Sequence, residues 1–174
     1  MSLSVRKIVI SGILGAIAIL LGVTRLGFIP VPTPAGHATI MHIPVILGGV
    51  LEGPVVGLIT GAIFGLFSFL QPGAPFFADP LVSILPRLFI GIAAYLVYAA
   101  TRRINNTLAA VLAGAVGSAV NTILVMGMIT LRGYLPAEVS LSVGLLHGIP
   151  ELIVAAVLTV VLVKGIQRIR PQEE

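Results

Sequence analysis

The sequence contains no cysteine, and charged side chains make up only 9% of its 174 residues. Without cysteine, a disulfide framework, a thiol nucleophile and a cysteine-ligated metal site are excluded. Soluble domains carry about 25% charged residues, so this chain has too few to cover a surface that faces water. With 57% hydrophobic residues, it is predicted to be an integral protein of a lipid bilayer.

Motifs for enzymatic chemistry are also missing. There is no Walker A sequence, no HExxH and no GxSxG, so ATP binding by a P-loop and two common hydrolase mechanisms are excluded. We predict neither an enzyme, nor a cofactor, nor a metal site. The net charge of +4 does not indicate nucleic acid binding, because the basic residues lie at the ends of apolar segments, where they orient helices.

Six apolar segments predict the fold class: a single all-α bundle of six transmembrane helices, formed by residues 1–174 as one domain. The predicted segments are residues 8–29, 42–52, 55–70, 79–103, 108–131 and 143–163. The second is shorter than the roughly 20 residues that span a bilayer. Residues 28–44 and 71–80 are rich in proline and glycine, and we expect them to form ordered external loops.

Basic residues are distributed unevenly between the two sides of this bundle. The side that holds both termini collects seven, Arg6, Lys7, Arg102, Arg103, Lys164, Arg168 and Arg170, and the opposite side two, Arg25 and Arg132. Cytoplasmic loops carry the excess of Lys and Arg in membrane proteins. We therefore predict that both termini are cytoplasmic and that the proline-rich loops face outside.

Arg87 lies inside the fourth apolar segment, directly after Pro86. A charge at that depth is costly and usually faces a protein interior or a water-filled cavity. Polar residues on the last three segments form stripes at helical spacing. They are Ser83 with Arg87, Ser118 with Asn121, and His147 with Glu151.

Two interpretations of these stripes stay open. Arg87 and Glu151 could neutralise each other as a buried pair that stabilises the bundle. We favour a pocket open to the outside, in which Arg87, a fixed cation with a bidentate donor fork, binds a ligand carboxylate or phosphate. The predicted substrate residues are Arg87, Asn121, Glu151, His147 and Ser83.

The loop of residues 28–44 adds His37 and Thr39 to this set. Two histidines five residues apart, His37 and His42, have no carboxylate or cysteine nearby, so a metal site is not expected. For these loop histidines, exposure to solvent is favoured over lining a pocket.

Small residues predict two close helix contacts. Gly57, Gly61 and Gly65 form a GxxxGxxxG row against which a neighbouring helix can pack. In the first segment, Gly12 and Ala16 form a small-xxx-small pair, which on its own indicates ordinary packing within the bundle.

Three stretches carry a family resemblance: HATIMHIPVILGGVLEGPVVGLITGAIFGL, ILPRLFIGIAAYLVY and GSAVNTILVMG. They resemble substrate-binding S components of energy-coupling factor (ECF) vitamin transporters, over residues 11–163. IMHIP, PRLFIG and VNTILV are most similar to the pantothenate-type branch and to relatives assigned to hydroxymethylpyrimidine.

The resemblance implies a prokaryotic plasma-membrane protein that captures a vitamin from outside with high affinity. It implies assembly with a transmembrane coupling component and two cytoplasmic ATPases, and toppling of the S component to release its ligand inward. Small residues on the first helix, often AxxxA in the family, contact the coupling component, and the matching pair here is Gly12 and Ala16. Pantothenate, with one carboxylate, two hydroxyls and an amide, suits Arg87 together with Asn121, His147 and Glu151.

Two other classes of protein compete with this interpretation. A stand-alone proton-coupled secondary transporter would use Glu151 and His147 as a proton relay, but no inverted repeat is evident. A purely structural membrane subunit is disfavoured by the polar stripes.

Overall fold

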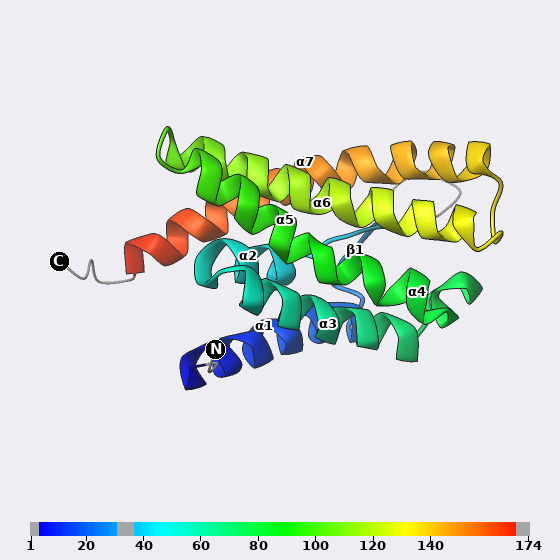
Figure 1. Cartoon of the computed structure of the whole chain (residues 1–174), viewed down its shortest axis with the longest axis horizontal. Coiled ribbons are helices and arrows are strands. Elements are labelled where there is room, and N and C mark those ends of the chain that lie inside the picture. Colours follow the sequence, from blue (N-terminus) through cyan, green and yellow to red (C-terminus); the bar gives the residue numbers. More distant parts are fainter. Residues whose placement is uncertain (1–3, 31–36, 170–174) are drawn as a thin grey trace.

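The computed structural model describes residues 4–30 and 37–169 and is built almost entirely of helices. The elements, in chain order, are α1 (Val5–Val23), β1 (Phe28–Pro30), β2 (His37–Thr39), α2 (Ile43–Glu52), α3 (Pro54–Leu70), the 3-10 helix η1 (Pro75–Ala78), α4 (Pro80–Ser83), α5 (Leu85–Thr101), α6 (Asn106–Leu131) and α7 (Ala137–Ile169). Counting α4 with α5, six helical segments form one bundle, which confirms the predicted all-α membrane fold (Figure 1).

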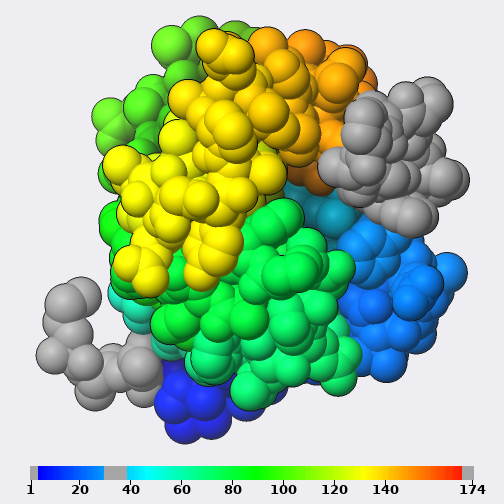
Figure 2. All heavy atoms as spheres, turned by 90° about the vertical axis from the view of Figure 1, so that its right-hand side faces the viewer, coloured from blue at the N-terminus to red at the C-terminus, as the bar shows by residue number. Residues whose placement is uncertain are grey.

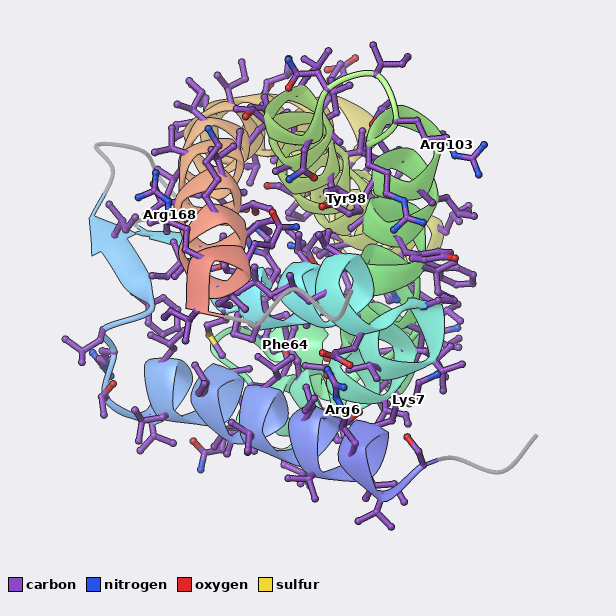
Figure 3. The ribbon with its side chains drawn as sticks, turned by 90° about the vertical axis from the view of Figure 1, so that its left-hand side faces the viewer. Arg6, Lys7, Phe64, Tyr98, Arg103 and Arg168 are labelled. Carbon is purple, nitrogen blue, oxygen red and sulfur yellow. The ribbon has the colours of Figure 1, made fainter. Side chains whose placement is uncertain are left out.

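Four of these segments are long and apolar enough to cross a membrane, and α2 and α3 are shorter apolar helices. The start of α1, the end of α7 and the α5–α6 turn lie at one end of the bundle, and η1 and the α6–α7 connection lie at the other (Figure 1). Figure 3 looks onto the first of these ends and shows Arg6, Lys7, Arg103 and Arg168 around it. These four basic residues therefore gather at one end of the molecule.

The first helix is shorter than predicted. The apolar run of residues 8–29 suggested one continuous span, but α1 ends at Val23 and the chain turns at Arg25, which has a φ of 58°. Phe28 to Pro30 then form β1, which pairs antiparallel with β2 and places Phe28 opposite Thr39. Apolar character alone could not distinguish the end of a membrane helix from the start of a short strand.

Helix α2 lies at the centre of the bundle. Every residue from Ile43 to Val50 is buried, and α2 contacts α1, α3, α5, α6 and α7. Because a ten-residue helix is only about 15 Å long, α2 does not cross the bundle. Its amino terminus, at His42, lies inside the protein.

The predicted glycine row packs α3 directly against α5. A Cβ atom on Gly57 would lie 2.8 Å from the Cα of Gly91, and one on Gly61 would lie 2.2 Å from the carbonyl oxygen of Arg87. Such close approach of two backbones requires glycine. The row therefore fixes the position of Arg87 at the helix interface.

Candidate substrate-binding site

Arg87 occupies the first turn of α5 and is only 5% exposed. The predicted continuous segment 79–103 is interrupted at Ile84, between α4 and α5. Pro86 has no N–H to donate, so the carbonyl of Val82, four residues earlier, lacks its usual helical partner. The Nη1 atom of Arg87 donates to that carbonyl at 2.7 Å, and the proline thereby creates the acceptor that orients the buried cation.

Two aromatic rings flank the Arg87 guanidinium. Its Cζ atom lies 5.4 Å from the ring centroid of Phe64 on α3 and 5.1 Å from that of Phe77 in η1. Both distances are within the range of cation–π attraction. The guanidinium Nε atom is buried and has no hydrogen-bond partner. The Nε atom therefore keeps an unused hydrogen-bond donor.

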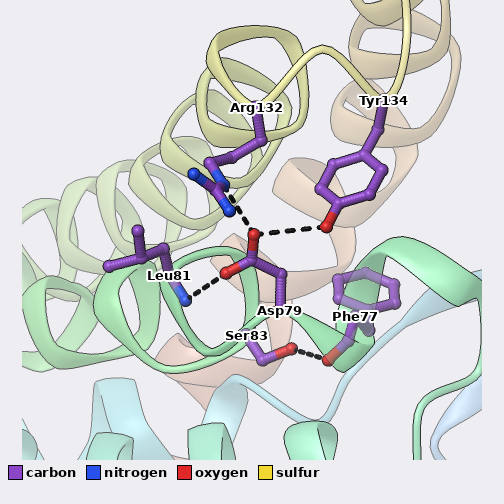
Figure 4. A network of polar contacts seen from close by, with 6 residues as sticks. All are labelled: Phe77, Asp79, Leu81, Ser83, Arg132 and Tyr134. Atoms are coloured by element: carbon purple, nitrogen blue, oxygen red, sulfur yellow. Dashed lines mark hydrogen bonds and ion pairs between the residues drawn. The ribbon is translucent and has the colours of Figure 1, made fainter.

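Phe77 is held over Arg87 by a polar network at the end of the bundle that holds η1 and α4 (Figure 4). The Ser83 hydroxyl donates to the Phe77 carbonyl, and Asp79 caps α4 by accepting from the Leu81 amide at 2.9 Å. Asp79 also accepts from Arg132 Nε at 2.6 Å and from the Tyr134 hydroxyl at 3.2 Å. We call Asp79, Arg132 and Tyr134 the Asp79 latch, since they join the η1–α4 connection to the α6–α7 connection.

The Asp79 latch shifts the pKa of its carboxyl group. The hydrogen bond from Arg132 lowers the pKa of Asp79 below its ordinary value, and the bond from the Leu81 amide lowers it further. The carboxylate therefore stays ionised in mildly acidic solution.

Glu151 on α7 is buried and anchors the β-hairpin. Its Oε1 atom accepts a hydrogen bond from the backbone N–H of Thr39 at 2.7 Å. Arg87 lies within electrostatic range of Glu151. However, the ion pairs among residues 4–30 and 37–169 are Arg6–Glu52 at 3.4 Å and Arg132–Asp79 at 2.6 Å. Arg87 and Glu151 therefore do not form the direct ion pair that was one of the two interpretations of the polar stripes.

His42 is wholly buried, which corrects the expectation that it is exposed to solvent. It lies at the amino terminus of α2, where the helix starts within the bundle, and it interacts electrostatically with Arg87. Neither of its ring nitrogens has a hydrogen-bond partner. The side chain of the other loop histidine, His37, falls outside the described part, although its backbone belongs to β2.

The polar residues predicted to form stripes on α6 and α7 face the interior of the bundle. Asn121 and His147 are buried, and His147 Nδ1 lies 3.3 Å from the Val143 carbonyl oxygen. A Cβ on Gly148 would lie 3.0 Å from the Thr122 side chain. Asn121 is next to Thr122 and Glu151 is one turn from Gly148, so these two residues lie at similar levels along the axis of the bundle. The Asn121 Oδ1 atom has no partner.

The structure thus brings Arg87, Glu151, Thr39 and the unpredicted His42 together, with Asn121 and His147 on the two adjoining helices. Ser83 lies beside them, but its hydroxyl holds Phe77. Sequence reasoning missed Phe77 and Asp79. The Asp-Pro pair at residues 79–80, a helix-start signal, could have indicated the cap but not the ring over Arg87.

The end of the bundle that holds η1 and α4 is hollowed. In Figure 2 a hollow opens between α7, in orange, and the η1–α4 region, in green. Atoms at its floor are teal, the colour of the chain around α2. A separate shallow depression of about 400 Å³ follows the first turns of α7 and ends at His147; Arg87 and Asn121 do not line it. The hollow in Figure 2 is the better candidate for an entrance.

Helix α1 presents a second candidate surface. Ser11, Gly15 and Ala18 face the bundle, whereas Gly12 and Ala16 are exposed. A Cβ on Gly12 would meet nothing within 4 Å. The small-residue pair therefore does not serve the internal packing that its spacing alone suggested.

Comparison with known proteins agrees with this architecture. The sequence model of the family described as "ECF transporter, substrate-specific component" matches residues 6–163. The protein called "Pantothenic acid transporter PanT" from Lactococcus lactis subsp. cremoris (strain MG1363) is 30% identical over 159 residues, which cover 76% of this chain and 79% of that protein. The chain belongs to the family of substrate-specific components of ECF transporters.

Proposed function

We propose that this protein is the pantothenate-binding S component of an ECF-type uptake transporter. Family membership makes it the substrate-specific subunit, and the relative at 30% identity carries the name of a pantothenic acid transporter. The observation that carries the choice of substrate is Arg87, a buried cation with an unpartnered Nε edge.

The chemistry of pantothenate matches the polar groups around Arg87. A guanidinium binds a carboxylate through two parallel N–H donors, and Val82 occupies only Nη1. Asn121 and His147, on the two adjoining helices, suit the hydroxyls and the amide at the other end of the molecule. Thr39 and Glu151 would close the site from the hairpin side.

Ligand binding to purified Arg87→Ala and Arg87→Lys proteins tests the assignment. Hydrogen bonds to charged groups contribute about 1.5–3 kcal/mol, so we expect pantothenate affinity to fall roughly 10- to 150-fold in Arg87→Ala. Arg87→Lys keeps the charge but loses the two-pronged donor group, so we expect its pantothenate affinity to lie between those of the wild type and Arg87→Ala. Arg103→Ala, at the opposite end of the bundle, is the matched control and should bind normally.

Unchanged pantothenate affinity in both Arg87 variants would rule out this role. If both variants also bound hydroxymethylpyrimidine tightly, the substrate would be that neutral pyrimidine, which does not need the cation. Mass spectrometry of small molecules that co-purify with the protein offers an independent identification.

We further propose that ATP hydrolysis takes place in partner subunits: two cytoplasmic ATPases, joined to this protein by a transmembrane coupling component. The exposed pair Gly12 and Ala16 on α1 is the proposed contact with the coupling component. The basic end shown in Figure 3 would face the cytoplasm of a prokaryotic cell, because positive residues favour that side. Uptake into liposomes by this protein alone, driven by a pH gradient, would instead indicate a secondary transporter.

A further inference from the structure

We propose that His42 and the amino terminus of α2 form, together with Arg87, a subsite that binds the carboxylate end of the substrate. In this arrangement His42 is a specificity-determining residue that contacts the ligand directly. The proposal rests on the proposed function and adds to it a residue that the sequence placed at the protein surface.

The first observation is the unused hydrogen-bonding capacity of His42. The side chain is wholly buried, and both ring nitrogens lack a partner. Buried polar groups are hydrogen-bonded in the great majority of cases, and each exception requires an explanation. A neutral imidazole offers one N–H donor and one acceptor, so the missing partner must offer both functions or be two groups.

The second observation is the charge around His42. The amino terminus of a helix carries partial positive charge, and α2 begins inside the bundle with no acidic residue in its first turn and no side-chain cap. The Arg87 guanidinium adds a full positive charge nearby. Glu151 is the buried carboxylate within range, and its Oε1 atom is bonded to the Thr39 amide.

Together these groups give the region where α2 begins an excess of positive charge and two buried side chains with unused hydrogen-bonding atoms. The Nε edge of Arg87 and the His42 ring are both without partners, and an anion placed between them would accept from both. The glycine contact of Gly61 with the Arg87 backbone fixes this arrangement, since Val45, one turn after His42, also lies against Gly61. The hollow in Figure 2, with its teal floor, offers a route in from the outer end.

The β-alanyl half of pantothenate supplies both functions that His42 lacks. Its carboxylate accepts hydrogen bonds, and its amide N–H, two methylene groups away, donates one. We therefore infer that one His42 nitrogen donates to the carboxylate held by Arg87 and that the other accepts from the amide.

The test measures how strongly His42 responds to the ligand carboxylate. Binding of pantothenate and of panthenol, in which a primary alcohol replaces the carboxylate, is measured by calorimetry on the full-length protein and on His42→Leu. We expect His42→Leu to weaken pantothenate roughly 10- to 100-fold. The dissociation constant of panthenol divided by that of pantothenate should shrink at least several-fold in this variant, because His42 contributes less to the binding of panthenol.

Two further variants keep the test decisive. His42→Gln retains a donor and an acceptor, so it should recover part of the affinity; it also serves if His42→Leu does not fold. Thr60→Val is the matched control, because Thr60 is another wholly buried residue with an unpartnered side-chain oxygen, beside Gly48 on the far part of α2. It should leave the ratio unchanged.

An equal loss of affinity for both ligands in His42→Leu would overturn the inference, because a structural role does not distinguish a carboxylate from an alcohol. A wild-type protein that binds neither ligand would instead overturn the proposed function itself. Wild-type binding with an unchanged ratio in His42→Leu would leave the function standing and remove only the His42 contact.

Discussion

The backbone N–H of Thr39 donates a 2.7 Å hydrogen bond to Glu151 Oε1, across 112 positions of the sequence. This bond joins the β-hairpin to the middle of α7, beside Arg87. It gives Glu151 a role that does not need a direct ion pair: its carboxylate holds the hairpin in place at the proposed binding site.

The first prediction concerns this anchor. Glu151→Ala removes the acceptor, and Glu151→Gln keeps a weaker, neutral one. A hydrogen bond to a charged group contributes about 1.5–3 kcal/mol, so we expect hydrogen exchange at the Thr39 amide to accelerate roughly 10- to 150-fold in Glu151→Ala. Glu151→Gln should give a smaller acceleration.

The Ile40 amide provides the internal reference for that measurement. It donates to the Gly27 carbonyl at 2.9 Å at the base of the hairpin and does not depend on Glu151. Thr39 protection that survives in Glu151→Ala would contradict the anchoring role.

Much of the fold followed from the sequence, for simple physical reasons. Long apolar runs predicted the membrane helices, and proline density predicted a break in the helix before α2, where residues 28–30 and 37–39 form β-strands. The α3 glycine row predicted a close helix contact, which Gly61 makes with Arg87. Each of these signals is local: it lies in one stretch of the chain and reflects the backbone conformation or the solvation of that stretch.

The site could be predicted only in part. A charge within an apolar run identified Arg87, and helical spacing placed Asn121 and Glu151 on inward faces. The burial of His42 and the ring of Phe77 over Arg87 depend on contacts between distant segments, which no local pattern encodes. A helix as short as α2 could have suggested that its start lies inside the bundle.

The second prediction concerns the α3–α5 contact. A Cβ on Gly61 would come within 2.2 Å of the Arg87 carbonyl oxygen, so Gly61→Ala must separate the two helices. Overpacking of this kind costs about 1–3 kcal/mol, and we expect a lower melting temperature in detergent together with weaker ligand binding. Gly12→Ala is the matched control, because nothing lies within 4 Å of that Cβ. Equal melting temperatures for the two variants would refute the contact.

The third prediction concerns the proposed docking surface on α1. Gly12→Leu and Ala16→Leu add bulk to an exposed small-residue pair. The added side chains would keep the backbone of another helix at a distance. We expect both variants to bind pantothenate normally as isolated subunits but to co-purify poorly with the coupling component. Ile13→Leu, at an exposed position on the same helix, is the control and should assemble normally. Normal assembly of both bulky variants would exclude this face.

The fourth prediction concerns the Asp79 latch, which holds the η1–α4 connection and thereby Phe77 over Arg87. Asp79→Ala removes the acceptor for Arg132 and Tyr134 and the cap of α4. We expect bound pantothenate to dissociate several-fold faster in a chase experiment, since the ring that covers the cation is no longer held. Tyr134→Phe deletes only the longer bond, 3.2 Å, and should have a smaller effect.

The pH dependence of the same rate tests the latch independently. Because the folded-state pKa of Asp79 is lowered, its contribution is fully present above the ordinary aspartate value of about 3.9 and is lost only as the pH falls through the lower folded value. The latch should therefore remain closed between about pH 5 and pH 8, well above that ordinary aspartate value. The wild-type to Asp79→Ala ratio of dissociation rates should be constant over this range. A ratio that collapses between pH 7 and pH 5 would show that a group other than Asp79 controls release.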